Sequence, residues 1–390
     1  MTGDRAYDIV LFGATGFTGG LTAEYLAGHA DSRTRWALAG RNQAKLAAVR
    51  DRLTEIDPAC ADLPLLHADA TDPDSTARIA DAARVVISTV GPYARYGEPL
   101  VAACARSGTD YVDLTGEPAF VDRMYAKYHD EAVRSGARIV HACGFDAIPA
   151  DLGAYFTVKR LPENVPLRVE GFVRVRADAS GGTLHSLVGA LADATRPQRA
   201  GRRRPEERPA GRTARVSRRL TPKTRIGDGR ALPLPTLDPR VVIRSAAALE
   251  RYGPDFTYGH YLAVRRLHRA AGLVAGAGAL VALSALPPTR RLLLGLRRPG
   301  DGPSKERRAR HWFSVTFTGE GGGERVVTEV AGGDPGYDET AKMIAESALC
   351  LVHDELPVTA GQVTTATAMG DALIDRLTHA GIAFRVLDPT

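Results

Sequence analysis

Residues 7–19 read YDIVLFGATGFTG, and their pattern is the strongest indication of the fold class. Its first half is a short, mostly apolar run without alternation, which is typical of parallel strands buried on both faces. Its second half spaces three glycines as GxxGxxG and opens a helical pattern over residues 17–29. Gly13 permits a tight turn, Gly16 lets the backbone approach a pyrophosphate, and Gly19 allows close helix-to-strand packing. The stretch therefore predicts the phosphate-binding turn of a dinucleotide-binding fold.

Strand and helix patterns alternate from this turn to about residue 149. We expect strands at residues 7–12, 36–39, 63–67, 85–89, 110–114 and 138–141. We expect helices at residues 17–29, 43–56, after 72, and at 99–107 and 120–135. This alternation indicates right-handed βαβ crossovers. It predicts an α/β fold, with a Rossmann-type doubly wound parallel sheet in residues 1–150.

The pattern changes in residues 151–337. Alternating or β-branched runs predict strands at residues 167–176, 240–245, 311–318 and 324–331, the last two joined as a hairpin by Gly321-Gly322-Gly323. A helix is expected at residues 183–194. These elements predict a second α+β domain with a mixed or antiparallel sheet. Two further helices, at residues 339–356 and 369–380, follow it.

The composition excludes small disulfide scaffolds and peptide hormones. A chain of 390 residues with 44% hydrophobic and 25% charged residues has room for two or three globular domains. The four cysteines lie too far apart in sequence for a zinc or disulfide pattern, so no metal is expected. The N-terminus lacks the features of a signal peptide. We expect a cytoplasmic protein with reduced thiols.

The net charge of +6 is unevenly distributed. Residues 196–230 contain twelve Arg and one Lys against three acidic residues, a net +10, so the rest of the chain sums to −4. The segment has no aromatic interleaving and no helical period, and we interpret it as a mobile loop. It either attracts an anionic partner, such as a phosphopantetheine carrier, a lipid surface or RNA, or is a solvated insertion. Nucleic-acid binding is the least expected of these.

Residues 270–286 form an uncharged run flanked by arginines. Its seventeen residues lie at the lower limit of a membrane span, which needs roughly 17 to 25. Three interpretations stay open: a buried or acyl-pocket helix, a helix at the membrane surface, and a true span.

The end of the second strand favours NADP over NAD. NAD-specific sites place a carboxylate there, but this sequence has Ala39-Gly40-Arg41. Arg41 and Lys45 suit a 2′-phosphate, although Arg41 on its own also fits an ordinary surface residue. Asp69, after the third strand, is placed to meet the adenine amino group or to begin a helix. The predicted NADP(H) contacts are Gly13, Ala14, Thr15, Gly16, Phe17, Thr18, Gly19, Gly40, Arg41, Lys45, Asp69, Thr89, Val90, Gly91 and Pro92.

Longer motifs resemble one protein family over most of the chain. They are GATGFTG, ALAGR, TVGPYARYG, YVDLTGE, ACGFDAIPADLG, SGGT, VVIRSAAAL and TTATAMGDAL. They resemble the saccharopine dehydrogenase-like oxidoreductases, in particular the actinobacterial trans-acting enoyl reductases. The resemblance implies NADPH-dependent reduction of an enoyl intermediate on a modular synthase, in the synthesis of complex envelope lipids and glycolipids. It also implies that residues 338–390 complete the first domain, and that peripheral contact with the plasma membrane accompanies the family.

Catalytic candidates follow from the loops after the fourth to sixth strands, where ligands of open α/β sheets bind. Tyr93 and Tyr96 could donate to an enolate oxygen, and His141 or Asp146 could deliver a proton. Backbone N–H groups around Gly91 or Gly144 could do the same. Tyr93 also fits a packing aromatic, and His141 also fits a hydrogen-bonded core histidine. A membrane-associated NADP-binding protein without turnover, or a reductase of another substrate, stays an alternative.

Overall fold

The computed structural model describes residues 5–177, 211–217, 219, 230–234, 236–264 and 302–388. The chain divides into two compact units. The first combines residues 1–148 with residues 337–380, and the second combines residues 149–336 with residues 381–390. Each unit is therefore assembled from two separate parts of the sequence.

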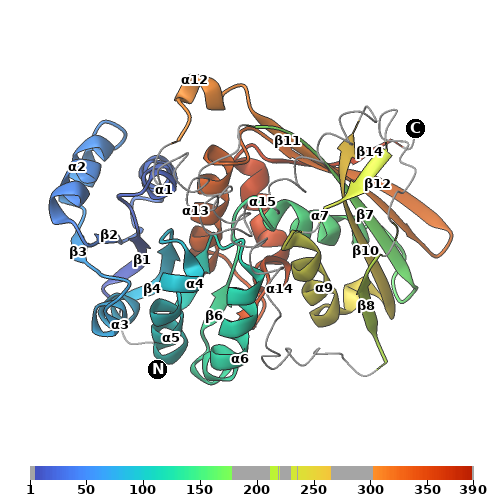
Figure 1. The fold of residues 1–390 in the computed structure, drawn as a ribbon, viewed down its shortest axis with the longest axis horizontal. Helices are drawn as coiled ribbons and strands as arrows, with labels where there is room; N and C mark the ends of the chain where they lie inside the picture. The colour runs from blue at the N-terminus through green and yellow to red at the C-terminus, as the bar shows by residue number, and fades with distance from the viewer. Residues whose placement is uncertain are drawn as a thin grey trace, which may run out of the picture. The chain divides into compact units, whose positions relative to one another are not determined.

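The first unit is built on a parallel sheet with the strand order β13-β6-β5-β4-β1-β2-β3 (Figure 1). Its strands are β1 (Tyr7–Phe12), β2 (Trp36–Gly40), β3 (Leu65–His67), β4 (Ala83–Ser88), β5 (Asp110–Asp113), β6 (Arg138–Val140) and β13 (Gly361–Val363). The chain winds outward from β1 to β3, then returns to the other side of β1 with β4. This order confirms the predicted Rossmann-type doubly wound sheet.

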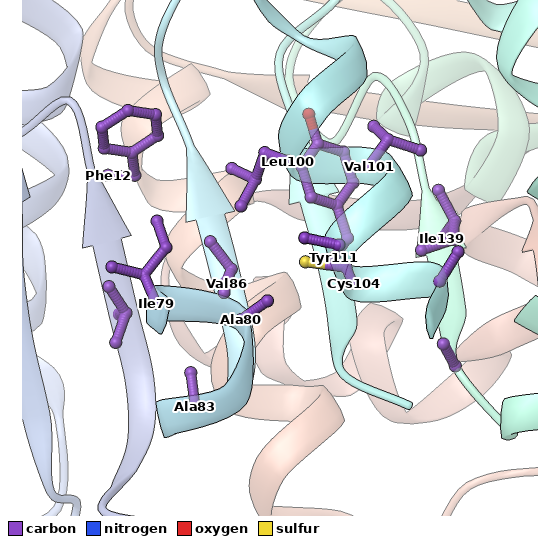
Figure 2. Packing of buried hydrophobic residues seen from close by; sticks show 14 of the residues in the cluster. Phe12, Ile79, Ala80, Ala83, Val86, Leu100, Val101, Cys104, Tyr111 and Ile139 are labelled. Carbon is purple, nitrogen blue, oxygen red and sulfur yellow. The ribbon is translucent and has the colours of Figure 1, made fainter. Parts of the chain in front are cut away.

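Helices cover both faces of this sheet. They are α1 (Phe17–His29), α2 (Gln43–Leu53), α3 (Pro73–Ala82), α4 (Tyr93–Tyr96), α5 (Glu98–Ser107), α6 (Pro118–Ser135), α13 (Asp338–His353), α14 (Thr365–Ala368) and α15 (Gly370–His379), with a 3-10 helix at Pro58–Asp62. Helices α3, α5 and α6 pack on one face, and α1 and α13 pack on the other. Figure 2 shows the core of the first face, where Phe12 and Val86 from strands meet Ile79, Leu100 and Cys104 from helices.

The C-terminal part of the first unit completes a helical layer and the sheet. Helix α13 lies along α1, where the hydroxyl of Tyr25 donates to Oε1 of Glu346 at 2.7 Å. Strand β13 lies beside β6, and the N–H of Gly361 donates to the carbonyl of Ala137 at 2.8 Å. The sequence pattern predicted a helix at α13 but not β13, because Gly361-Gln362-Val363 is not an apolar run.

The second unit is built on a mixed sheet with the order β14-β12-β11-β7-β10-β8, and β9 pairs with β10. Its strands are β7 (Leu167–Arg176), β8 (Thr213–Val216), β9 (Arg230–Pro233), β10 (Asp255–Val264), β11 (Trp312–Gly321), β12 (Glu324–Gly332) and β14 (Ala383–Leu387). Strand β10 runs parallel to β7 and β8, and the other pairs are antiparallel. Both the mixed sheet and the β11–β12 hairpin confirm the predictions.

The described helices of this part of the chain are α7 (Ile148–Val158), α9 (Asp238–Ala248) and α12 (Lys305–Arg308), with a 3-10 helix at Glu250–Tyr252. Helix α9 shows that the strand predicted at residues 240–245 is wrong. Its buried residues include Val241, Val242, Ser245 and Ala246, which share one helical face. The β-branched run favoured a strand, but burial of this face decided the structure.

The basic segment 196–230 is only partly described. Residues 213–216 form β8, so the loop interpretation is wrong for that stretch. The guanidinium of Arg212 donates to the carbonyls of Gly253, Ala246 and Leu249, so it anchors the strand. The expected helix at residues 183–194 and the apolar segment 270–286 lie outside the described residues. Within the described ranges, no helix has the length and apolarity to cross a membrane.

Candidate functional site

Three glycines shape the turn between β1 and α1. Gly13 has a φ of +99°, in the region that favours glycine. A Cβ on Gly13 would lie 2.5 Å from Oγ1 of Thr89, and a Cβ on Gly19 would lie 2.1 Å from the carbonyl oxygen of Gly13. A Cβ on Gly16 would meet only that carbonyl, at 3.4 Å, and Thr15 and Gly16 are exposed. Gly13 and Gly19 thus close the turn, and Gly16 leaves the backbone open to a pyrophosphate at the helix N-terminus.

The first residues after β4 support this turn from the side. The N–H and the hydroxyl of Thr89 both donate to the carbonyl of Phe12, at 2.9 and 3.2 Å. The side chain of Val90 would lie 2.9 Å from a Cβ on Gly13. The next two residues, Gly91 and Pro92, are exposed. Of the predicted cofactor contacts in this loop, Thr89 and Val90 therefore support the glycine turn, and Gly91 and Pro92 are accessible to a ligand.

The other residues of the glycine turn are held by one local and one distant contact. Ala14 is buried, and the carbonyl of Thr18 accepts the hydroxyl of Thr22 at 2.9 Å. The ring of Phe17 meets Tyr337 edge to face, with centroids 4.8 Å apart. Tyr337 comes from the C-terminal return of the chain, and no sequence motif signalled this contact.

The end of β2 carries cations and no carboxylate. Gly40 ends the strand, and Arg41 and Lys45 are exposed where α2 begins. The side chain of Asn42 caps α2 by accepting the N–H of Lys45 at 2.9 Å. Two cations and the first turn of a helix fit the 2′-phosphate of NADP.

Asp69 lies in the loop after β3, as the sequence predicted. Its Oδ1 accepts the N–H and the hydroxyl of Thr71, both at 2.8 Å. The hydrogen bonds from Thr71 hold the pKa of this carboxyl below its usual value. Asp69 thus shapes its own turn, and its contact with adenine stays a prediction.

Tyr93 is buried at the start of α4. Its hydroxyl donates to the carbonyl of Ser88 at 2.9 Å and accepts the N–H of Leu114 at 3.1 Å. Burial raises its pKa well above the usual value. Because both bonds lie within the protein, the geometry favours the packing role for Tyr93 over proton donation. Tyr96 differs, since it is half-buried and the guanidinium of Arg95 lies 4.9 Å from its ring centroid.

Glu117 ties the loop after β5 to the loop after β4. Its two carboxylate oxygens accept the N–H groups of Tyr93 and Ala94, at 2.9 and 2.8 Å. The first N–H groups of a helix have no backbone acceptor within the helix, and the Glu117 carboxylate accepts them for α4. The sequence placed Glu117 at this edge of the sheet but did not reveal this cap.

Asp113 organises the carboxyl ends of β5 and β6. Its buried carboxylate accepts four hydrogen bonds, from the Tyr111 hydroxyl, the Thr115 N–H, the Ala142 N–H and Nδ1 of His141. Ala142 has a φ of +62°, a strained conformation for a residue with a Cβ. The sequence pattern did not single out Asp113, although a charged residue at the end of an apolar strand indicates a functional or structural role.

His141 is buried, and its ring meets Phe120 and Tyr111 edge to face. Asp146 follows on the same loop and is exposed. Its Oδ2 would lie 3.0 Å from a Cβ on Gly116, so the carboxyl group lies against the loop after β5. Gly144 is confined between the side chains of Leu114 and Thr340, which would lie 2.8 and 3.0 Å from its Cβ. Of the two predicted proton carriers, only Asp146 faces solvent.

Several known proteins resemble this chain in sequence or in fold. Residues 9–140 match the family model described as the saccharopine dehydrogenase NADP binding domain. Proteins named trans-acting enoyl reductase in Mycobacterium ulcerans and Mycobacterium tuberculosis are each 38% identical to this chain, with 97% of both chains covered. Apo saccharopine dehydrogenase (L-Glu forming) from Saccharomyces cerevisiae shares the fold, with a TM-score of 0.56 and 13% identity over 98% of this chain and 100% of the yeast chain.

Proposed function

Since this chain belongs to the saccharopine dehydrogenase-like family of trans-acting enoyl reductases, we propose that it reduces the carbon–carbon double bond of an α,β-unsaturated acyl thioester. The protein is an NADP-dependent oxidoreductase. The observation that carries the proposal is the extent of the similarity, which covers 97% of this chain and so includes both units. A match confined to the NADP domain would support only cofactor binding.

The substrate we propose is an acyl or polyketide intermediate attached to the carrier domain of a separate synthase, in the biosynthesis of complex lipids. The word trans-acting in the relatives' names supports an intermediate made by another protein. We further propose a cytoplasmic enzyme with peripheral membrane contact through residues 270–286. Flotation with anionic and neutral vesicles tests that contact, and an absence from both vesicle fractions would contradict it.

The reaction needs a hydride at the β-carbon, a donor to the enolate oxygen and a proton at the α-carbon. Bound NADPH supplies the hydride. We assign the enolate contact to the Tyr96 hydroxyl or to the backbone N–H of Gly91 in the exposed loop after β4. The N–H groups of Cys143 and Phe145, on either side of Gly144, already donate within the protein. We assign the proton to Asp146, because it is the exposed acid of these loops. Thr89 and Glu117 hold the loops in place.

The test measures NADPH consumption with an unsaturated acyl-pantetheine thioester. The matched control is the saturated thioester of the same length, and Asp146→Asn tests the proton assignment. We expect consumption only with the unsaturated thioester, and a loss of at least about a hundredfold in Asp146→Asn. NADPH binding without consumption would favour an NADP-binding protein without turnover. Consumption with a 2-oxo acid and an amino acid, but not with the thioester, would favour another reductase substrate.

A further inference from the structure

The pairing of β2 with β3 places one more residue beside the cations at the end of β2. His67 is the Cα partner of Gly40 in the parallel register, and the N–H of Ala68 donates to the carbonyl of Gly40 at 3.1 Å. Paired residues of neighbouring strands direct their side chains to the same face of a sheet. The side chain of His67, the last residue of β3, therefore lies on the same face of the sheet as a Cβ on Gly40 would.

That face is the one on which α2 begins. A Cβ on Gly40 would lie 3.5 Å from the side chain of Leu46, which follows Lys45 in the first turn of α2. Leu66 packs instead against the core on the opposite face. Because side chains alternate along a strand, His67 must lie on the α2 side. Gly40 adds no side chain of its own, and the buried side chain of Leu46 packs against this position, so the exposed His67 lies beside the start of α2.

The basic side chains near His67 are those of Arg41 and Lys45, and together they can bind an anion. The pKa of Asp69 is lowered first by its hydrogen bonds from Thr71 and then by the positive charges of Arg41 and His67. Arg41 and His67 thus both lie close enough to Asp69 to act on its carboxylate. Arg41, Lys45 and His67 are exposed. In the described part of the chain their side chains form no hydrogen bond or ion pair, although Arg41 and His67 act at longer range on Asp69.

We propose that His67 is a third ligand of the NADP 2′-phosphate, beside Arg41 and Lys45, and that it contributes to the preference for NADPH over NADH. A phosphate dianion offers three acceptor oxygens, more than one guanidinium can satisfy. NADH carries a hydroxyl at the same position and offers no charge to His67. The inference concerns the cofactor site, so it does not depend on the acyl substrate.

The test is a fluorescence titration of NADPH and NADH against His67→Gln. We expect the affinity for NADPH to fall about three- to tenfold, while the affinity for NADH stays unchanged. His67→Glu should lower the affinity for NADPH further, because it places a negative charge beside the phosphate. The control is His29→Gln, an exposed histidine at the far end of α1, which should leave both affinities unchanged.

Three outcomes would overturn the assignment. An equal loss of NADPH and NADH affinity in His67→Gln would mean that the imidazole contacts the adenine or supports the loop. Unchanged affinity for both cofactors would mean that His67 touches neither. A drop in NADPH affinity of the same size in His29→Gln would mean that surface charge in general, and not this position, determines the preference.

Discussion

Nδ1 of His141 lies 2.7 Å from Oδ2 of Asp113, and both side chains are buried at the carboxyl ends of neighbouring strands. The carboxylate accepts the Nδ1–H, which fixes the ring and directs Nε2 away from Asp113. Among the described residues, Nε2 has no hydrogen-bond partner. The hydrogen bond between Asp113 and His141 joins two loops that we assign to the substrate site. Its main role is therefore to hold those two loops in position.

We predict that Asp113→Asn lowers the free energy of unfolding by about 2–4 kcal/mol. The amide keeps only one acceptor oxygen for four donors, and its NH₂ group would face the donors of His141 or Ala142. Urea denaturation measures the loss. Asp62→Asn, an exposed acid at the end of the 3-10 helix, is the control and should change stability by less than about 0.5 kcal/mol. Equal stability of the two variants would contradict the role of Asp113.

We predict that Tyr93→Phe destabilises the protein but leaves the chemistry intact. The variant loses the bonds to Ser88 and Leu114, which together are worth about 1–3 kcal/mol. Turnover of NADPH with an unsaturated thioester should stay within about twofold of the unchanged protein. A proton donor would instead lose about a hundredfold or more. Such a loss in a folded variant would restore Tyr93 as a catalytic candidate.

We predict that Gly19→Ala weakens NADPH binding by more than about tenfold. The new Cβ would lie 2.1 Å from the carbonyl oxygen of Gly13, so the turn must open. Gly28→Ala, in the last turn of the same helix, is the matched control. Its Cβ would lie 3.6 Å from the side chain of Ile56, an ordinary contact. We expect that control to bind NADPH normally, and similar binding by both variants would refute the tight turn.

A buried acid and a buried histidine in the second unit predict a stability that depends on pH. Burial raises the pKa of Asp238 to about 7 and lowers the pKa of His260 to about 4. Oδ1 of Asp238 lies 3.8 Å from Nε2 of His260, whose Nδ1 is hydrogen-bonded to the hydroxyl of Tyr258.

Between about pH 4 and about pH 7, the folded protein keeps a proton on Asp238 that the unfolded chain releases. The contribution of Asp238 to the free energy of unfolding therefore falls as the pH rises through this range, by on the order of 4 kcal/mol. Asp238→Asn cannot ionise. The free energy of unfolding of Asp238→Asn minus that of the unchanged protein should therefore be larger at about pH 7.5 than at about pH 5, as measured by urea denaturation.

His260→Gln provides the control with the opposite sign. Below about pH 6.5 the unfolded chain binds a proton on His260 that the folded protein does not bind until about pH 4. The contribution of His260 therefore falls as the pH falls, and His260→Gln should gain stability relative to the unchanged protein at the lower pH. A slope of the same sign in both variants would contradict the opposed pKa shifts.

Local patterns were sufficient for the strands of the first unit between Tyr7 and Val140. These strands follow short apolar runs, and the hairpin from Trp312 to Gly332 follows alternating or β-branched runs, both of which are visible in the sequence. The strand predicted at residues 240–245 was wrong, because β-branched residues pack equally well on a buried helical face. Strands β13 and β14 escaped prediction because they are short and depend on partners far away in the chain.

Residues close together in the chain specify the doubly wound sheet, the glycine turn and the lack of a carboxylate at the end of β2, and the sequence alone was enough to predict them. Only the tertiary structure decided that Asp113 meets His141, that the hydroxyl of Tyr93 is used inside the protein, and that His67 lies beside Gly40. Those relations join different strands and loops. They arise from strand register and burial, which bring together side chains that are far apart in the sequence and that no local pattern connects.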